Sequence, residues 1–377
     1  MSHRARLLLA ALLAPFVAAT AIGLVVLWPE DATPPIPDAI GPPADLADGS
    51  VTAVERRACR GTEESQGVVC QQVNVRLTSG PLDGEDVDLE ISEGPGSPRL
   101  ERGDAIVLGR VVGDEAGGDT WYFADFQRRA PLLLLGVLFA AAVVALARWR
   151  GILALAGLAV SLVVLVRFVL PAILEGSNPV SVAVVGSAAI MFVALYMAHG
   201  FNARTTTAVL GTLASLLLTG LLAWAFVEAG RFTGLASEEA GFLQATVERV
   251  SLRGLLLGGI VIGSLGVLDD VTVTQASAVW ELHVANPAYG FRRLFSAGLR
   301  IGRDHIASTV NTLVLAYAGA SLPLLVLFTL SNRNLGDVVT GELVAQEIVR
   351  TLVGSIGLVA AVPVTTALAA LVAERSR

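Results

Sequence analysis

The sequence predicts a mainly helical, polytopic membrane protein of about eight transmembrane helices, with a small extracytoplasmic β-barrel-like domain between helices 1 and 2. Hydrophobic residues make up 54% of the chain and charged residues only 16%, whereas charged residues account for about a quarter of a typical soluble domain. Several apolar runs reach the roughly 20 residues that cross a bilayer. Between the first two runs, short segments alternate between apolar and polar residues, as strands do.

Eight apolar runs are candidate spans, and the sixth is unusually short. They are Leu7–Leu27, Ala130–Ala147, Ile152–Leu170, Val180–Ala198, Ala208–Val227, Leu255–Leu268, Ala307–Leu330 and Leu352–Val372. The first run is longer than the apolar region of a typical signal peptide, which favours an uncleaved anchor over a cleaved signal. The chain therefore divides into an anchor (1–29), a Pro-rich linker (30–50), a β-domain (51–127) and a seven-helix transmembrane domain (128–377).

Arginine sets the expected orientation, because all 26 basic residues are Arg. In an eight-span arrangement eleven of them fall on one side of the membrane, at or near the span ends: Arg4, Arg6, Arg148, Arg150, Arg204, Arg292, Arg293, Arg300, Arg303, Arg375 and Arg377. Basic residues are retained on the cytoplasmic side. Both termini and residues 280–305 are therefore expected in the cytoplasm and residues 30–126 outside. The lack of Lys and the Ala-, Arg- and Val-rich composition indicate a high-GC bacterium, and the cytoplasmic (inner) membrane as the location.

The predicted outer segment is strongly acidic. Residues 30–126 hold seven Arg and 20 acidic residues, a formal charge of −13. This charge keeps a domain soluble and speaks against nucleic acid as a partner. The predicted strands are 50–59, 68–80, 86–92, 104–112 and 120–126, separated by Gly, Pro and Asp clusters. So many short strands in so few residues favour a small OB-like barrel or sandwich.

The two cysteines of the chain, Cys59 and Cys70, both lie in this segment. In an oxidising compartment, two thiols that flank a short polar stretch between strands are expected to form a disulfide. A metal pair or a redox couple is the alternative. Neither a CxxC motif nor a nearby His supports it, so we expect no metal.

The chain lacks the common catalytic signatures HExxH, GxSxG, the P-loop and the Gly-rich nucleotide fingerprint. Its four histidines, His3, His199, His283 and His305, are scattered near predicted span ends. We therefore expect neither an enzyme nor a bound cofactor, and we leave an intramembrane enzyme as the least favoured hypothesis.

The sixth run ends in two acidic residues, Asp269 and Asp270, followed by the hydroxyl- and β-branched-rich "VTVTQAS". A carboxylate at membrane depth costs several kcal/mol unless it is paired, protonated or hydrated. A short span followed by weak helix formers is typical of a broken or re-entrant helix that lines a cavity. At 1.5 Å per residue, the seventh span brings polar residues to a similar depth. The predicted pathway comprises Asp269, Asp270, Thr272, Thr274, Gln275, Ser277, Asp304, Ser308, Thr309, Asn311 and Thr312.

Small residues in the sixth run predict close helix packing. They are Gly258, Gly259, Gly263 and Gly266, and they include a Gly-x-x-x-Gly pair. Residues 280–305 place Arg beside apolar residues, which predicts an amphipathic helix on the inner leaflet. Residues 230–254 predict a similar surface helix outside.

Four segments of the chain resemble the YibE/F family of bacterial membrane proteins. They are "YFADFQRR", "GSLGVLDDVTVTQASAVWEL", "GLRIGRDHIASTVNTLVLAYAGASLPLL" and "GSIGLVAAVPVTTALAA". The resemblance extends from about Ala105 to the C-terminus. It implies one anchor span, an outer β-domain and a seven-span bundle, together with a role in transport, but no established substrate or catalytic residue.

Two functions from different classes are compatible with these features. The first is a secondary transporter or channel for a small solute or ion, in which the Asp pair couples to protons or cations, because two adjacent buried carboxylates should not both ionise without a cation. The second is a membrane scaffold or assembly factor whose outer domain binds a partner, with the aspartates capping a helix that starts at Val271. Either function has the lipid bilayer as a partner, and a second membrane subunit or a homo-oligomer is compatible with both.

Overall fold

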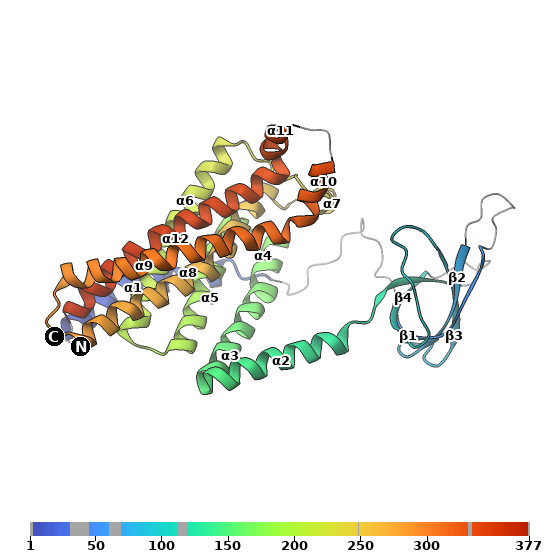
Figure 1. Cartoon of the computed structure of the whole chain (residues 1–377), viewed down its shortest axis with the longest axis horizontal. Helices are drawn as coiled ribbons and strands as arrows, with labels where there is room; N and C mark the ends of the chain where they lie inside the picture. The colour runs from blue at the N-terminus through green and yellow to red at the C-terminus, as the bar shows by residue number, and fades with distance from the viewer. Residues whose placement is uncertain are drawn as a thin grey trace. The chain divides into compact units, whose positions relative to one another are not determined.

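The computed structural model describes residues 3–30, 45–59, 69–111, 119–247, 249–330 and 334–375. It divides into two compact units, one formed by Met1–Pro35 with Val143–Arg377 and the other by Ile36–Ala142 (Figure 1). The predicted Pro-rich linker over residues 30–50 lies mostly outside the described residues.

The smaller unit contains a five-stranded antiparallel sheet. Its strands are β1 (Asp45–Ala58), β2 (Val69–Leu77), β3 (Asp86–Ser92), β4 (Ala105–Val111) and β5 (Thr120–Phe126), in the order β3-β2-β1-β4-β5. The five strands match the five predicted segments closely. The predicted barrel is wrong in one respect, because β3 and β5 lie in contact but do not pair through hydrogen bonds within the described residues, so the sheet is not closed.

A bulge in β1 changes which residues of this strand face the core, from odd-numbered to even-numbered positions. Ala47 and Val51 point into the core, and the register then shifts between Val51 and Ala53, so that one extra residue reverses the alternation. Beyond the bulge Val54 packs against the core, while Glu55 is exposed. The core is completed by apolar residues of the other strands and of the β3–β4 connection: Val73, Val75, Leu77, Leu89, Leu100, Ile106 and Leu108.

The predicted disulfide is present and joins Cys59, just after β1, to Cys70 in β2. Closing a loop of 11 residues should stabilise the sheet by roughly 3 kcal/mol, mainly by restricting the unfolded chain. We therefore expect a Cys59→Ser, Cys70→Ser variant to unfold its sheet at lower denaturant concentration, measured by limited proteolysis of the full-length protein. Two alkylatable thiols in unreduced wild-type protein, counted by mass spectrometry, would contradict the pairing.

The larger unit is helical. Its helices are α1 (His3–Val26), α3 (Trp149–Val164), the π-helical turn η2 (Leu165–Val169), α4 (Leu170–Leu174), α5 (Pro179–His199), α6 (Ala203–Ala229), α7 (Glu238–Thr246), α8 (Leu252–Ala285), α9 (Phe291–Ala320), α10 (Leu322–Leu330), α11 (Leu335–Thr340) and α12 (Glu342–Glu374). Helix α2 (Arg129–Ala147) belongs partly to each unit. Among the described residues, seven helices are long and apolar enough to cross a membrane, or up to eight if the bent pair α9–α10 counts as one span. The chain is thus a multi-pass membrane protein.

Helix α8 is continuous, and this corrects the predicted break after Asp270. Its N-cap is Ser251, whose hydroxyl oxygen accepts a hydrogen bond from Gly254 N, and the helix continues without a break to Ala285. The "VTVTQAS" stretch has weak intrinsic helix propensity, but Val271, Thr272 and Gln275 are buried against neighbouring helices, and packing overrides propensity. Because Asp269 and Asp270 lie inside this continuous helix, they do not cap a helix N-terminus.

The helix break lies in the next span instead, where α9 and α10 meet at Ser321 with a bend of 63°. The predicted separate amphipathic helix over residues 280–305 is also wrong. These residues form the end of α8, a short turn and the first half of α9. Arg292, Arg293, Arg300 and Arg303 therefore belong to the same helix as the apolar second half of this span.

Helix α9 runs antiparallel to α8 along most of its length. Leu294 clusters with Val279, Ile306 and Val310 pack with Leu268 and Val271, and the Tyr317 hydroxyl lies against Gly263. Because α9 runs antiparallel alongside α8, it spans the same depth of the helical bundle as α8 does.

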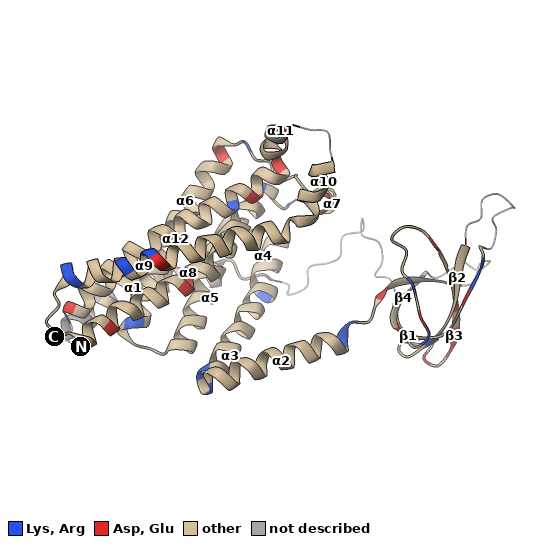
Figure 2. Cartoon of the chain, viewed as in Figure 1, with Lys and Arg blue, Asp and Glu red and all other residues tan. Residues whose placement is uncertain are grey.

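The first and last helices meet at one end of the bundle. Leu9 of α1, Leu210 of α6 and Val372 of α12 form one buried cluster. A chain whose two ends lie on the same side of a membrane crosses it an even number of times, which fits the count of eight spans that results if α9 with α10 is one span. Charged residues are sparse along the middle of the helices and more frequent toward their ends (Figure 2), as expected where the middle lies in hydrocarbon.

Candidate functional site

Helices α6, α8 and α12 pack against one another and bury polar side chains among apolar ones (Figure 1). With α5 they contribute a set of buried hydroxyl and amide residues that we call the polar seam. It comprises Ser187, Thr205, Thr207, Thr212, Ser215, Thr219, Ser264, Thr272, Gln275, Thr351, Ser355, Thr365 and Thr366. Small and hydroxyl residues of this kind allow close helix approach and hydrogen bonding across helices.

Many seam hydroxyls use their single proton within their own helix. Thr219 donates to Ser215 O at 2.8 Å, Ser264 to Ile260 O at 2.7 Å and Thr366 to Val362 O at 2.6 Å. A hydroxyl has one donor and two acceptor lone pairs, so these side chains offer only acceptor oxygens to the space between helices. These three side chains therefore suit protons and cations better than anions.

Close contacts between glycine and threonine hold α6 and α12 together. A Cβ atom added to Gly211 would lie 2.2 Å from Thr365 Oγ1, and one added to Gly357 would lie 2.0 Å from Thr219 Oγ1. Neither distance is compatible with a real side chain. Glycine is therefore required at both positions, because the facing threonine fills the space that a side chain would need.

Two hydrogen-bonded links cross the seam. The Thr212 and Thr272 hydroxyl oxygens are 2.7 Å apart and join α6 to α8. One α-helical turn further along α8, Gln275 Nε2 donates to Gly298 O and to Thr366 Oγ1, both at 2.7 Å. Gln275 thereby ties α8 to α9 and α12 at once.

Asp269 lies directly beside the first of these links. Thr272 Oγ1 is 3.2 Å from the backbone oxygen of Asp269, and the Thr212 side chain interacts with the Asp269 carboxylate. Nevertheless the Oδ1 atom of Asp269 is buried without a hydrogen-bond partner among the described residues. Asp270, its neighbour, is exposed. The structure thus distinguishes the two aspartates, and only Asp269 faces the seam.

Four further seam oxygens are buried without a hydrogen-bond partner among the described residues. They are Ser187 Oγ, Ser215 Oγ, Ser355 Oγ and Thr365 Oγ1. Together with Asp269 Oδ1 they come from all four helices of the seam. A buried polar atom without a partner costs about 1–3 kcal/mol and needs a physical explanation, such as a water or an ion at that position. These five atoms on four helices are therefore candidates for contact with a water or an ion.

The other predicted pathway residues divide between the seam and the opposite surface. In α8, Thr272 and Gln275 are buried, Ser277 is half-buried and Thr274 is exposed. In α9, Thr309 is half-buried, whereas four residues are exposed: Asp304, Ser308, Asn311 and Thr312. Asn311 follows Val310, which packs with Leu268 and Val271, so it lies near the level of Asp269. Its side chain, however, is on the outer face of α9.

The predicted packing glycines of α8 have different surroundings. A Cβ on Gly258 would approach Pro179 O at 3.1 Å and Ala183 Cβ at 3.2 Å, so this residue lets α5 come close. A Cβ on Gly263 would lie 3.4 Å from the Tyr317 hydroxyl, an ordinary van der Waals contact. Around Gly259 and Gly266 no described atom beyond their own helix lies within 4 Å. Of the four predicted packing glycines, Gly258 is therefore the one that lets another helix come close.

Sequence reasoning missed the contributions of α6 and α12 to the seam. A signal was present in α6, where Thr205, Thr212 and Thr219 recur every seven residues, or about two helical turns. That spacing places the three hydroxyls on one helix face. Nothing in the sequence indicated that this face meets Asp269, because the partners Thr212 and Thr272 are 60 residues apart.

Comparison with known proteins agrees with this architecture. A family model described as YibE/F-like protein matches residues 135–375, which include every helix of the polar seam. No curated protein and no solved structure matches the chain. Because the matched residues make up more than half of its length, the chain belongs to the YibE/F family.

Proposed function

We propose that this protein is a secondary transporter or channel in which Asp269 binds and releases a proton or a small cation along the polar seam. The observation that carries the proposal is the buried, unpartnered Oδ1 atom of Asp269. A buried carboxylate oxygen without a donor is costly. A bound proton or cation would remove that cost, and its release would restore it, which is the property that a coupling site needs.

The chemistry of the polar seam, which Asp269 faces, supports a positively charged species. The hydroxyls of Thr219, Ser264 and Thr366 present acceptor oxygens because their protons are used within their own helices. Oxygen acceptors and a carboxylate are suitable ligands for alkali and alkaline-earth cations and for a proton carried by water. We place Thr272 and Gln275 as positioning residues for this path, and we assign no enzymatic step and no cofactor to it.

Flux measurements in liposomes test the proposal. The purified full-length protein is reconstituted into sealed vesicles with an imposed pH gradient, and proton flux is followed with an enclosed pH-sensitive dye while Na⁺, K⁺ or Mg²⁺ is added outside. Protein-dependent dissipation of the gradient, accelerated by one of these cations, is the expected result. A gradient that decays as in protein-free liposomes under every condition would refute the coupling role.

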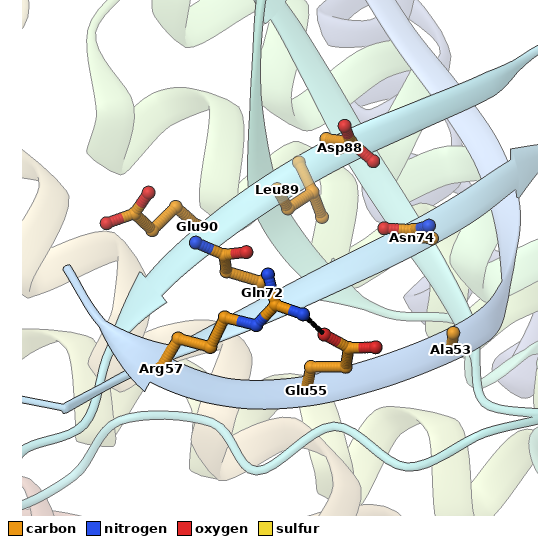
Figure 3. A pocket seen from close by; sticks show the side chains of 8 residues that line it. All are labelled: Ala53, Glu55, Arg57, Gln72, Asn74, Asp88, Leu89 and Glu90. Carbon is orange, nitrogen blue, oxygen red and sulfur yellow. Dashed lines mark ion pairs between the residues drawn. The ribbon is translucent and has the colours of Figure 1, made fainter. Parts of the chain in front are cut away.

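A scaffold function is the second candidate, and a feature of the sheet favours it. The solvent face of β1, β2 and β3 forms a polar groove in which the Glu55–Arg57 ion pair lies beside Gln72 and Glu90 (Figure 3). These side chains are presented at the surface, where a partner such as a second membrane subunit could meet them. Removing the groove charges should then abolish partner co-purification while leaving flux unchanged.

We further propose that the chain lies in the bacterial cytoplasmic membrane with both termini inside and the sheet unit outside. The arginine distribution supports this orientation, and an even number of crossings supports only that both termini lie on the same side. A reporter active only outside the cytoplasm, fused after Ser50, is expected to be active. If that reporter is inactive and a reporter that works only in the cytoplasm is active at the same position, the proposed orientation is wrong.

A further inference from the structure

A polar cavity of about 330 Å³ lies at the end of the helical unit where α5 is followed by α6. Four helices form it. Arg150 of α3, His199 of α5, Arg204 of α6 and Ser277 of α8 contribute polar side chains, and Trp280 contributes an aromatic wall. Of the residues that line the cavity, Thr205 alone also belongs to the polar seam, and the charged lining residues lie outside the seam.

The charge of this cavity is predominantly positive. Arg150 and Arg204 line the cavity together with His199, and each of the two arginines acts electrostatically on His199. Glu281 is the counter-charge, with its Oε1 3.4 Å from an Arg204 guanidinium nitrogen, but its side chain is 69% exposed. An exposed ion pair of this kind contributes little. The cavity therefore has the electrostatics of an anion site.

The cavity wall is held in place by the turn between α5 and α6. Asn202 Nδ2 donates to His199 O at 2.8 Å, while its Oδ1 accepts from Thr205 N at 3.0 Å and caps α6. Tyr196 stacks on Phe201 with ring centroids 4.5 Å apart, and its hydroxyl bonds Thr206. Asn202 is fully used in this construction, so the ligand-binding groups are the two arginines and His199.

The N-terminus of α6 adds to the positive electrostatic potential of the cavity. This helix has 27 residues, and the N-terminus of a helix carries a partial positive charge that favours anions. Arg204 and Thr205 belong to its first turn and line the cavity. The helix dipole and the arginine side chains therefore act in the same direction on any group bound there.

We propose that this cavity binds a phosphate group, either in the headgroup of an anionic phospholipid or as free phosphate. Arginine matches phosphate oxygens with two parallel hydrogen bonds, and two arginines on different helices can hold one phosphate from two sides. Basic pockets between transmembrane helices at the membrane surface are suited to lipid headgroups, and Trp280 is an interfacial residue type. This inference does not depend on the transport proposal.

Lipid retention by the full-length protein tests the proposal. Protein in detergent is mixed with phosphatidylglycerol or phosphatidylcholine, and bound lipid is counted by native mass spectrometry. In parallel, inorganic phosphate is added without lipid, and thermal unfolding is recorded. The test variant is Arg150→Gln, Arg204→Gln. The matched control is Arg292→Gln, Arg293→Gln, which removes two arginines of α9 that do not line the cavity.

Wild type and control are expected to retain phosphatidylglycerol at least tenfold better than the test variant, with little retention of phosphatidylcholine by any of them. That result assigns the phosphate to a lipid. Stabilisation of wild type and control, but not of the test variant, by inorganic phosphate assigns it to a free anion. If the test variant does not fold, Ser277→Leu takes its place, because it fills the cavity without changing its charge. This variant should show the same loss of phosphatidylglycerol retention or of stabilisation by phosphate. Equal behaviour of the folded cavity variants and wild type toward both probes would overturn the proposal.

Discussion

The Asp269→Asn variant is expected to lose proton- or cation-coupled flux, down to the rate of protein-free liposomes, while remaining folded. Asparagine has the shape of aspartate but neither titrates nor carries charge. Replacing a buried, unpartnered carboxylate oxygen by an amide also removes its desolvation cost, so the thermal stability of the variant should equal or exceed that of wild type. Function and stability are thus expected to change in opposite directions, as is common at functional sites.

Asp270→Asn is the matched control, because it makes the same chemical change one residue away on an exposed side chain. It should retain most of the flux. Gradient dissipation in the reconstituted vesicles distinguishes the variants, and thermal unfolding in detergent reports whether each is folded. Full activity of Asp269→Asn would remove Asp269 from any coupling role. Equal loss in both variants would mean that the charge of the pair matters rather than the position of Asp269.

Gly357→Ala is expected to destabilise the helical unit strongly for a change of one methyl group. The new Cβ would lie 2.0 Å from Thr219 Oγ1 and 3.3 Å from Thr219 Cβ. Since Thr219 Oγ1 is also bonded to Ser215 O, relief requires α6 and α12 to separate or the threonine to give up that bond. Overpacking of this kind costs about 1–3 kcal/mol, and the melting temperature in detergent should fall accordingly.

A second substitution tests whether the contact causes the loss. Thr219→Ala removes the atom that meets the new methyl group, so the Gly357→Ala, Thr219→Ala double variant should recover much of the lost stability, and the pair should couple in a double-mutant cycle. Gly259→Ala is the control, because no described atom beyond its own helix lies within 4 Å of the added Cβ. Its melting temperature should not fall. Unchanged stability of Gly357→Ala would show that α6 and α12 do not pack this closely.

The sheet unit could be predicted almost completely from the sequence. The alternation of apolar and polar residues and the Gly, Pro and Asp clusters placed all five strands, and the position of Cys59 and Cys70 led to the disulfide. These are local signals, in which the pattern and its structural result lie in the same few residues. Whether β3 and β5 pair depends on how strongly the sheet curls, which no local pattern specifies. The predicted barrel-like domain is an open sheet for that reason.

The spans and the candidate aspartates also followed from the sequence alone, because apolar length and buried charge are properties of single segments. The course of α8 through Thr272 and Gln275 did not follow, because their weak helix propensity is outweighed by hydrogen bonds and packing from α6, α9 and α12. The surroundings of Asp269 did not follow from the sequence either. Its neighbours are the hydroxyls of α6 rather than those of α9, a choice made by the rotation of each helix about its axis, which is decided only when helices far apart in the chain pack against one another.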